Sequence, residues 1–281
     1  MLDGRKPPQD FIAKRHSTTY DYISPLKLDL AGKHVLVTGA AWEDGVGYAT
    51  ATAFARTGAS AITVVDLHGV SDELVSKLKT AVVQAGRPEP DVLSRTVDIA
   101  KPEDVQALRE TVAARFGECI NVIINNAAHM EPYAPFLETD PDVYWRTWDV
   151  NLHGLINMAR AFLPSQLSSR SSDNTLCTMI NVASREVDGD HADRVRGEGL
   201  LTFYINPRAI KTKITEGTPE PIRNMLPGRP DIAGDTIVWL AAWRKEWLGG
   251  RYVSCPWDME VLISRKDEIV EGDKFKLKVV F

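Results

Sequence analysis

Short runs of β-branched and other apolar residues alternate with segments of helical period along most of this 281-residue chain. Because each expected strand is followed by a helical segment, the next strand is reached by a crossover, and crossovers build a parallel sheet with helices on both faces. The expected strands cover residues 33–38, 61–66, 93–98, 119–125, 176–182, 200–205 and 249–255. The expected helices cover residues 47–57, 71–84, 102–116, 141–163 and 231–242. The sequence therefore predicts an α/β protein with a doubly wound parallel sheet of about seven strands.

The chain has the size and composition of one domain. With 44% hydrophobic and 25% charged residues, it can bury one large core. No repeat or low-complexity linker interrupts the alternation, so we expect a single domain. Its expected parts are an N-terminal extension over residues 1–32, a main unit over residues 33–265 and a strand-like C-terminal tail over residues 266–281.

Charge, cysteine content and hydropathy argue against several classes of protein. The formal net charge is −5 and no basic run occurs, so we expect no nucleic-acid partner. Cys119, Cys177 and Cys255 lie in apolar, strand-like surroundings, which indicates reduced thiols and a reducing compartment. Residues 1–30 contain no apolar run of signal-peptide or membrane length. We therefore expect cytoplasmic localisation, with no membrane partner and no metal site.

A glycine-rich turn follows the first expected strand. Its residues of interest are Thr38, Gly39, Gly45, Val46 and Gly47. Glycines let the backbone turn sharply and approach a pyrophosphate, while the helix that begins near Gly47 points unpaired N–H groups at the anion. The same glycines would also suit a loop that only needs positive φ, so the turn is interpreted together with the strand after it.

An acidic residue ends the second expected strand. Asp66 lies nineteen residues after Gly47, where a carboxylate accepts hydrogen bonds from an adenosine ribose diol and repels a 2′-phosphate. Glu43 and Asp44 add negative charge to the turn, and no arginine stands beside Asp66. The sequence therefore predicts a dinucleotide cofactor, NAD or NADP, with Asp66 favouring NAD.

These motifs, together with Asn125-Asn126-Ala127-Ala128 after the fourth expected strand, resemble the short-chain dehydrogenase/reductase family. The likeness covers most of the chain and implies a Rossmann-like fold and an NAD(P)-dependent oxidoreductase acting on a carbonyl or alcohol. The family's Thr-Gly-x-x-x-Gly-x-Gly turn is present with two extra residues between its first two glycines. The C-terminal part resembles fungal members, which implies a small, secondary-metabolite-like substrate. By this resemblance Asn125 and Ala127 contact the cofactor, although paired asparagines also cap strands and make turns.

The resemblance assigns cofactor contacts in two further segments. Asp98 and Ile99, at the end of the third expected strand, correspond to residues that bind the adenine ring. Pro207, Ile210 and Thr212 correspond to the family's Pro-Gly-x-x-x-Thr segment, which holds the nicotinamide carboxamide. An arginine stands in place of the glycine of that segment.

Two residues match the family's catalytic positions. Asn151 corresponds to the active-site asparagine, and helical spacing is expected to put it on a sheet-facing stripe with Thr147, Leu155 and Met158. A buried asparagine bonded to a backbone carbonyl would also explain it. Ser184 ends the fifth expected strand and corresponds to the serine that polarises the substrate carbonyl, although serine is also a common turn residue.

The family's catalytic Tyr-x-x-x-Lys pair has no counterpart, because no tyrosine of the chain is followed by lysine four positions later. Only residues 185–199 separate Ser184 from the sixth expected strand, enough for a shortened parallel crossover but too few for the family's long helix. General acid–base catalysis is worth about 10²- to 10⁴-fold in rate. His191 is the candidate substitute acid, with an exposed loop histidine as the alternative interpretation. Tyr204 with Arg208 is the nearest approach to the Tyr-x-x-x-Lys pair. A tyrosine buried on a strand explains Tyr204 more simply than a catalytic role.

The short crossover has consequences for assembly and function. It would leave one sheet face thinly covered unless a partner or the N-terminal extension covers it. A homodimer through helix 141–163 is possible, but the usual helix interface is incomplete. Two alternatives to the oxidoreductase stay open. One is an altered family member acting as an isomerase, a cyclase or a ligand-binding regulator, and the other is an inactive splice or gene-model variant.

Overall fold

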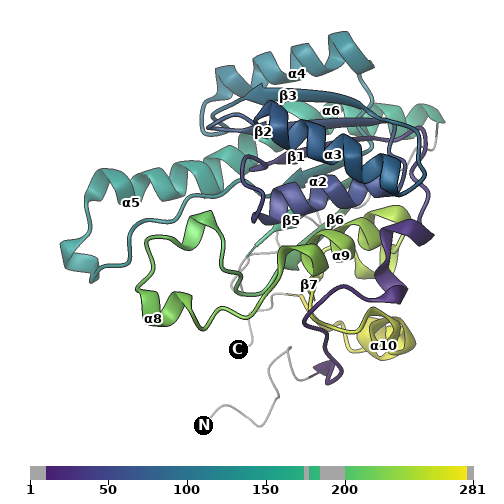
Figure 1. Cartoon of the computed structure of the whole chain (residues 1–281). Coiled ribbons are helices and arrows are strands. Elements are labelled where there is room, and N and C mark those ends of the chain that lie inside the picture. Colours follow the sequence, from purple (N-terminus) through teal and green to yellow (C-terminus); the bar gives the residue numbers. More distant parts are fainter. Residues whose placement is uncertain (1–10, 174–176, 184–199, 277–281) are drawn as a thin grey trace.

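The computed structural model describes residues 11–173, 177–183 and 200–276, which form one seven-stranded parallel sheet between two layers of helices (Figure 1). The strands stand in the order β3-β2-β1-β4-β5-β6-β7. They are β1 His34–Thr38, β2 Ala61–Asp66, β3 Asp91–Thr96, β4 Val122–Asn125, β5 Thr178–Val182, β6 Leu201–Asn206 and β7 Tyr252–Ser254. The order reverses between β1 and β4, as in a doubly wound, Rossmann-like sheet. The predicted fold class is confirmed.

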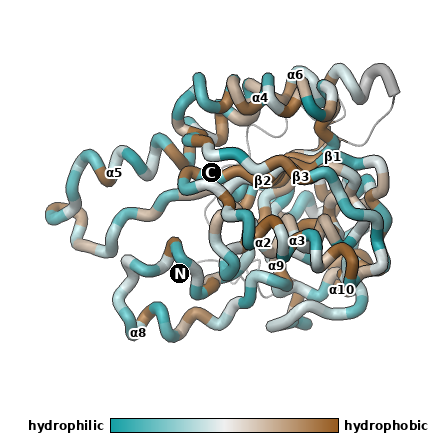
Figure 2. The backbone as a smooth tube through the Cα atoms, turned by 45° about the horizontal axis from the view of Figure 1, so that its top comes forward, coloured by the Kyte–Doolittle hydropathy of each residue, from teal (hydrophilic) through white to brown (hydrophobic). Residues whose placement is uncertain are grey.

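The central strands are apolar on both sides because helices cover both faces. Every residue of β1 and β2 is buried, which is the pattern of parallel strands inside an α/β sheet. β2 has the predicted bounds, whereas β3 begins and ends two residues earlier than predicted, at Asp91 and Thr96. β3 lies at the sheet edge with exposed residues, so its hydrophobic pattern marks its bounds poorly. In Figure 2 the hydrophobic colour gathers in the strands, while α5 and α8 carry mixed colours.

The helices form one layer on each face. The layer that contains α2, α3 and α9 covers one face, and α4 and α6 cover the other (Figure 1). The helices are α2 Val46–Arg56, α3 Asp72–Gln84, α4 Pro102–Phe116, α5 Pro141–Trp148, α6 Leu155–Asp173, α8 Glu220–Arg223, α9 Pro230–Ala242, α10 Met259–Ser264 and α11 Lys266–Glu271. Ser71 caps α3 by accepting from Leu74 N–H at 3.3 Å. Pro102 begins α4, which has the predicted bounds.

The long helix predicted over residues 141–163 is interrupted. A π-helical turn over Asp149–Gly154 separates α5 from α6. Gly154 lies close to the side chain of Ile99, because a Cβ at Gly154 would stand 2.7 Å from Ile99 Cδ1. Single π turns inside helices are frequent at functional sites. α5 extends beyond the body of the sheet, and the segment that bears α8 extends in the same direction (Figure 1).

The N-terminal extension packs on the α2–α9 side of the molecule. Ile12, Ile23, Leu28 and Leu30 are buried in the core of that side. The described residues of the extension therefore cover the α2–α9 side of the sheet. Their partners are α9, α10 and the loop before α10, which all belong to the α2–α9 side.

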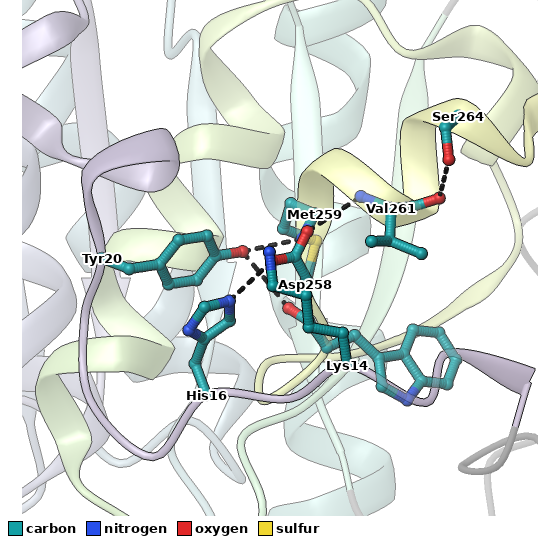
Figure 3. A network of polar contacts seen from close by, with 8 residues as sticks. Lys14, His16, Tyr20, Asp258, Met259, Val261 and Ser264 are labelled. Carbon is teal, nitrogen blue, oxygen red and sulfur yellow. Dashed lines mark hydrogen bonds and ion pairs between the residues drawn. The ribbon is translucent and has the colours of Figure 1, made fainter.

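Asp258 links the extension to the start of α10 by hydrogen bonds and an ion pair (Figure 3). Its carboxylate lies 2.7 Å from Lys14 Nζ and 2.7 Å from His16 Nε2, and it also caps α10 by accepting from Val261 N–H at 2.9 Å. Burial alone would raise the pKa of Asp258, but these hydrogen bonds and the Lys14 charge outweigh burial and hold the pKa at about 2. Tyr20 joins the cluster by accepting from Met259 N–H at 2.7 Å.

The C-terminal tail corrects one prediction. Residues 266–281 were expected to be strand-like, but Lys266–Glu271 forms α11. Ile269 of this helix is buried in the core, whereas Val270 is exposed, and the lysine alternation begins only after the helix. Residues 277–281 and the crossover residues 184–199 lie outside the described part of the chain.

Candidate active site

The glycine turn leaves β1 at the carboxyl edge of the sheet, and it has room for no side chain at two positions. Gly39 has φ +74, and a Cβ on it would lie 2.7 Å from Ala127 Cα. A Cβ on Gly47 would lie 2.2 Å from the Gly39 carbonyl oxygen. α2 begins at Val46, and its N-cap, Gly45, provides no side-chain cap. The first N–H groups of α2 therefore point from a tight turn toward the edge of the sheet, as anion-binding helices do.

Thr38 and Asn126 hold this turn against the end of β4. Thr38 Oγ1 accepts from the N–H groups of Asn126 and Ala127, both at 3.0 Å. Asn126 Nδ2 donates to the carbonyl oxygens of Thr38 at 2.9 Å and Gly39 at 3.0 Å. Sequence reasoning named Asn125 and Ala127 as site residues but missed Asn126. The paired asparagines were the available signal, because a second amide is needed to satisfy the carbonyls of so sharp a turn.

Asp66 ends β2 beside the turn. It is 8% exposed, and its two carboxylate oxygens accept from Ala41 N–H and His68 N–H, each at 3.0 Å. The first bond ties the glycine turn to β2. Each carboxylate oxygen has a second acceptor site, so Asp66 keeps capacity for another donor.

Asp98 and Ile99 lie in the turn after β3 rather than at its end. The preceding residue, Val97, donates its N–H to the Asp66 carbonyl oxygen at 3.0 Å, which places this segment beside the end of β2. Asp98 Oδ1 accepts from Arg146 of α5 at 2.9 Å. Ile99 is buried against the π-helical turn. The two residues therefore connect the carboxyl edge with α5 and α6.

Asn151 lies in the π-helical turn and is exposed, so the predicted sheet-facing stripe is wrong at this position. The stripe assumed a continuous α-helix, and a π turn shifts the residues that come after it. Asn151 Oδ1 accepts from His129 N–H at 2.8 Å, and Asn151 Nδ2 donates to the His129 carbonyl oxygen at 2.9 Å. The asparagine is thus joined by two hydrogen bonds to the segment that leaves β4.

A chain of polar contacts continues from the same segment. His129 Nδ1 lies 2.9 Å from Thr147 Oγ1, and Thr147 Oγ1 donates to Glu131 Oε2 at 2.6 Å. The hydrogen bond from Thr147 holds the pKa of Glu131 below its ordinary value. All three side chains are half-buried. The pattern of the sequence did not single out His129 or Glu131.

Polar side chains also stand on neighbouring strands near this edge. Asn125 ends β4 and donates from Nδ2 to Asn181 Oδ1 of β5 at 2.9 Å. Asn125 Oδ1 is buried and, among the described residues, has no hydrogen-bond partner. Tyr204 is buried on β6 in register with Asn181, as expected for a strand residue.

The segment after β6 has the backbone conformation that its motif implies. Arg208, which replaces a glycine in the family pattern, has φ +76, a region that glycine adopts without strain. Ile210 and Thr212 are buried, and Thr212 caps the helical turn Lys213–Thr215. Pro207 begins the segment directly after β6.

Two predicted catalytic residues, Ser184 and His191, lie outside the described residues. Asn151 is the one that the structure places, beside His129. In the described ranges, no helix has the length and apolar character needed to cross a membrane. Within the same ranges, no group of three His, Cys, Asp or Glu side chains is arranged to hold a metal ion.

The sheet order and the glycine turn at the carboxyl edge define a Rossmann-like α/β protein. A family model described as Enoyl-(Acyl carrier protein) reductase matches residues 39–192. The short chain dehydrogenase mpl6 of Monascus purpureus is 35% identical over 96% of this chain and 96% of its own length. The chain therefore belongs to the short-chain dehydrogenase/reductase family, an oxidoreductase family, and the predicted resemblance to fungal members is confirmed.

Solved structures agree on the fold. The 3-ketoacyl-(acyl-carrier-protein) reductase from Brucella melitensis, complexed with NADH, has a TM-score of 0.66 and 23% identity, covering 80% of this chain and 97% of its own. The L-sorbose reductase from Gluconobacter frateurii, complexed with NADPH and L-sorbose, has a TM-score of 0.64 and 21% identity, covering 81% of this chain and 96% of its own. At these identities the likeness shows the fold alone.

Proposed function

We propose that the chain binds a nicotinamide dinucleotide along the carboxyl edge and transfers a hydride between it and a carbonyl or alcohol carbon of a small molecule. The observation that carries this proposal is the glycine turn. Added Cβ atoms at Gly39 and Gly47 would lie 2.7 Å and 2.2 Å from neighbouring backbone atoms, and the N-terminus of α2 lacks a side-chain cap. A bare, positively polarised helix end beside a backbone without side chains fits a pyrophosphate.

The remaining cofactor-binding residues are assigned by their places around this turn. Asp66 would accept from the adenosine ribose hydroxyls, and Asp98 and Ile99 would border the adenine. When bound, the nicotinamide supplies or accepts the hydride. The nicotinamide carboxamide would be held by Pro207, Ile210 and Thr212, an assignment that the sequence pattern of their segment supports.

Buried Asn125 Oδ1 adds a further point of fit. An acceptor without a partner among the described residues costs free energy unless a donor meets it. It lies at the end of β4, between the glycine turn and β5, on the path of a dinucleotide along the edge. We propose that Asn125 Oδ1 accepts a hydrogen bond from the bound cofactor.

The cofactor is proposed to be NAD rather than NADP. Asp66 stands at the end of β2 with its carboxylate held by Ala41 and His68 N–H groups. A fixed carboxylate at this place repels a 2′-phosphate. Relatives in the family bear names of dehydrogenases, which supports a hydride transfer. The sequence pattern of the family assigns Ser184 and Asn151 to the substrate carbonyl.

The test is a titration of the purified protein with NADH and NADPH, combined with carbonyl turnover on the same sample. We expect saturable NADH binding, weaker NADPH binding and NADH oxidation with isatin, ethyl 3-oxobutanoate or 4-nitrobenzaldehyde. Gly47→Ala should abolish NADH binding, because its Cβ overlaps the Gly39 carbonyl. Gly86→Ala is the control for a loss of stability alone, because its φ of +67 strains any side chain while its Cβ meets nothing within 4 Å. Binding without turnover of any ketone or aldehyde would overturn the oxidoreductase and leave a nucleotide-binding protein.

A further inference from the structure

The contacts of His129 define the orientation and tautomer of its ring. Thr147 Oγ1 has one hydrogen, and its shortest contact is the 2.6 Å bond to Glu131 Oε2. Since a carboxylate is the stronger acceptor, the hydroxyl hydrogen goes to Glu131. Thr147 Oγ1 then accepts from His129 Nδ1 at 2.9 Å. The neutral imidazole therefore carries its hydrogen on Nδ1 and leaves Nε2 available.

Among the described residues, none forms a hydrogen bond with His129 Nε2. Glu131 lies close enough to His129 for the two charges to interact. His129 is half-buried, so its proton can be replaced from water.

The backbone of His129 is fixed in the region of the family's active-site asparagine. Both its N–H and its carbonyl oxygen bond the Asn151 amide, at 2.8 and 2.9 Å. Two residues earlier, Ala127 touches the glycine turn. Four residues later, Tyr133 N–H donates to the Gly217 carbonyl oxygen at 3.4 Å, in the segment between β6 and α9. His129 thus lies where the segments after β1, β4 and β6 come together at the carboxyl edge.

We propose that His129 is the proton donor and acceptor of the reaction, oriented by Thr147 and Glu131. This inference rests on the proposed function. In the reducing direction a bound, reduced nicotinamide would supply the hydride to the carbonyl carbon and would itself be oxidised. The C=O π bond breaks, and the oxygen takes the proton from Nε2 of the imidazolium, which becomes a neutral imidazole. Water returns the proton to Nε2, and the oxidising direction runs through the same steps in reverse.

His129→Gln tests the proposal. We expect kcat/KM for isatin to fall by about 10²- to 10⁴-fold, the range of general acid–base catalysis, while NADH binding is retained. The pH profile of kcat/KM should lose one ionisation. In His129→Ala, added imidazole should restore part of the activity, which a purely structural role would not allow. Glu131→Gln should give a smaller loss, because the amide oxygen still accepts from Thr147 but the charge is gone.

The matched control is His153→Gln. His153 lies on the π-helical turn that bears Asn151, its side chain is 65% exposed, and its Nδ1 lies 3.0 Å from Asp149 Oδ1. Replacing His153 should therefore leave kcat/KM unchanged. Equal kcat/KM in His129→Gln and the wild-type protein would overturn the proposal. So would a loss that imidazole does not restore in the alanine variant. Loss of turnover in His191→Gln with full turnover in His129→Gln would transfer the role to His191.

A second measurement needs no turnover. In ¹⁵N-histidine NMR spectra, assigned with His129→Gln, neutral His129 should show the Nδ1–H tautomer, and Thr147→Val should remove this preference. An Nε2–H tautomer in the wild-type protein would overturn the arrangement. If the wild-type protein binds NADH but reduces no carbonyl, the proposed function fails. The tautomer then still decides whether His129 presents a free Nε2 at the edge of the sheet.

Discussion

Replacing Asp258 by asparagine removes the negative charge that joins the N-terminal extension to α10 (Figure 3). The carboxylate is nearly fully buried, and its pKa is about 2 in the folded protein against an ordinary value of 3.8. Since one pKa unit corresponds to about 1.4 kcal/mol, the charged form stabilises the fold by about 2 kcal/mol. Asparagine can still accept from Val261 N–H, so the helix cap survives in Asp258→Asn. Alanine removes the cap as well and should cost about 1 kcal/mol more.

The sign of the pH dependence is set by the direction of this shift. The folded carboxyl has the lower pKa, so its contribution is fully present above the ordinary value of 3.8 and is lost as the pH falls toward 2. Urea unfolding followed by tryptophan fluorescence should therefore give a deficit of about 2 kcal/mol for Asp258→Asn at neutral pH. The deficit should shrink below pH 3.8 for as long as the folded state persists.

Asp21→Asn is the matched control for this experiment. Asp21 also pairs with a lysine, Lys27, but the two side chains are 84% and 54% exposed. Exposed ion pairs contribute from 0 to about 1 kcal/mol, so this variant should unfold close to the wild-type protein. If Asp258→Asn behaves like Asp21→Asn, or if its deficit is the same at neutral pH and at pH 3, the reasoning about the buried carboxylate is refuted.

Three further predictions concern single residues. Asp66→Ser should raise the affinity for NADPH relative to NADH in parallel titrations, and an unchanged ratio would contradict the role of the carboxylate. Arg208→Gly should raise the free energy of unfolding by up to about 1 kcal/mol in urea by relieving the positive φ, and a loss of stability would contradict this. Burial lowers the pKa of Lys245 to about 7, so between pH 7 and its ordinary 10.5 only the unfolded chain holds the proton and stability rises with pH. Lys245→Met should flatten that rise, and an unchanged slope would show that another group causes it.

The sequence predicted the sheet well where local patterns carry the information. The bounds of β2 and α4 are as predicted, because a run of buried β-branched residues and a proline at a helix start are local signals. The capping role of Ser71 is local in the same way. The edge strand β3 was placed two residues late, since exposed edge residues weaken the pattern.

The parts of the site that were missed depend on contacts between distant segments. The π-helical turn at Asn151 accompanies the close packing of Gly154 on Ile99, which no helical period within residues 141–163 encodes. The contact that marks His129 as a candidate joins its ring to Thr147, eighteen residues later in the chain. The bonds from Asn126 to the glycine turn link residues 87 and 88 positions apart.

The attachment of the N-terminal extension has a consequence for the order of folding. Lys14 and His16 contact Asp258, and Thr19 contacts Asp235, all more than 200 positions further along the chain. Contacts of such sequence separation form slowly, and chains are synthesised from the N-terminus. Lys14, His16 and Thr19 therefore cannot form these contacts until α9 and α10 have been synthesised. In a nascent chain arrested before Asp235, the first described residues should still be open to proteolysis.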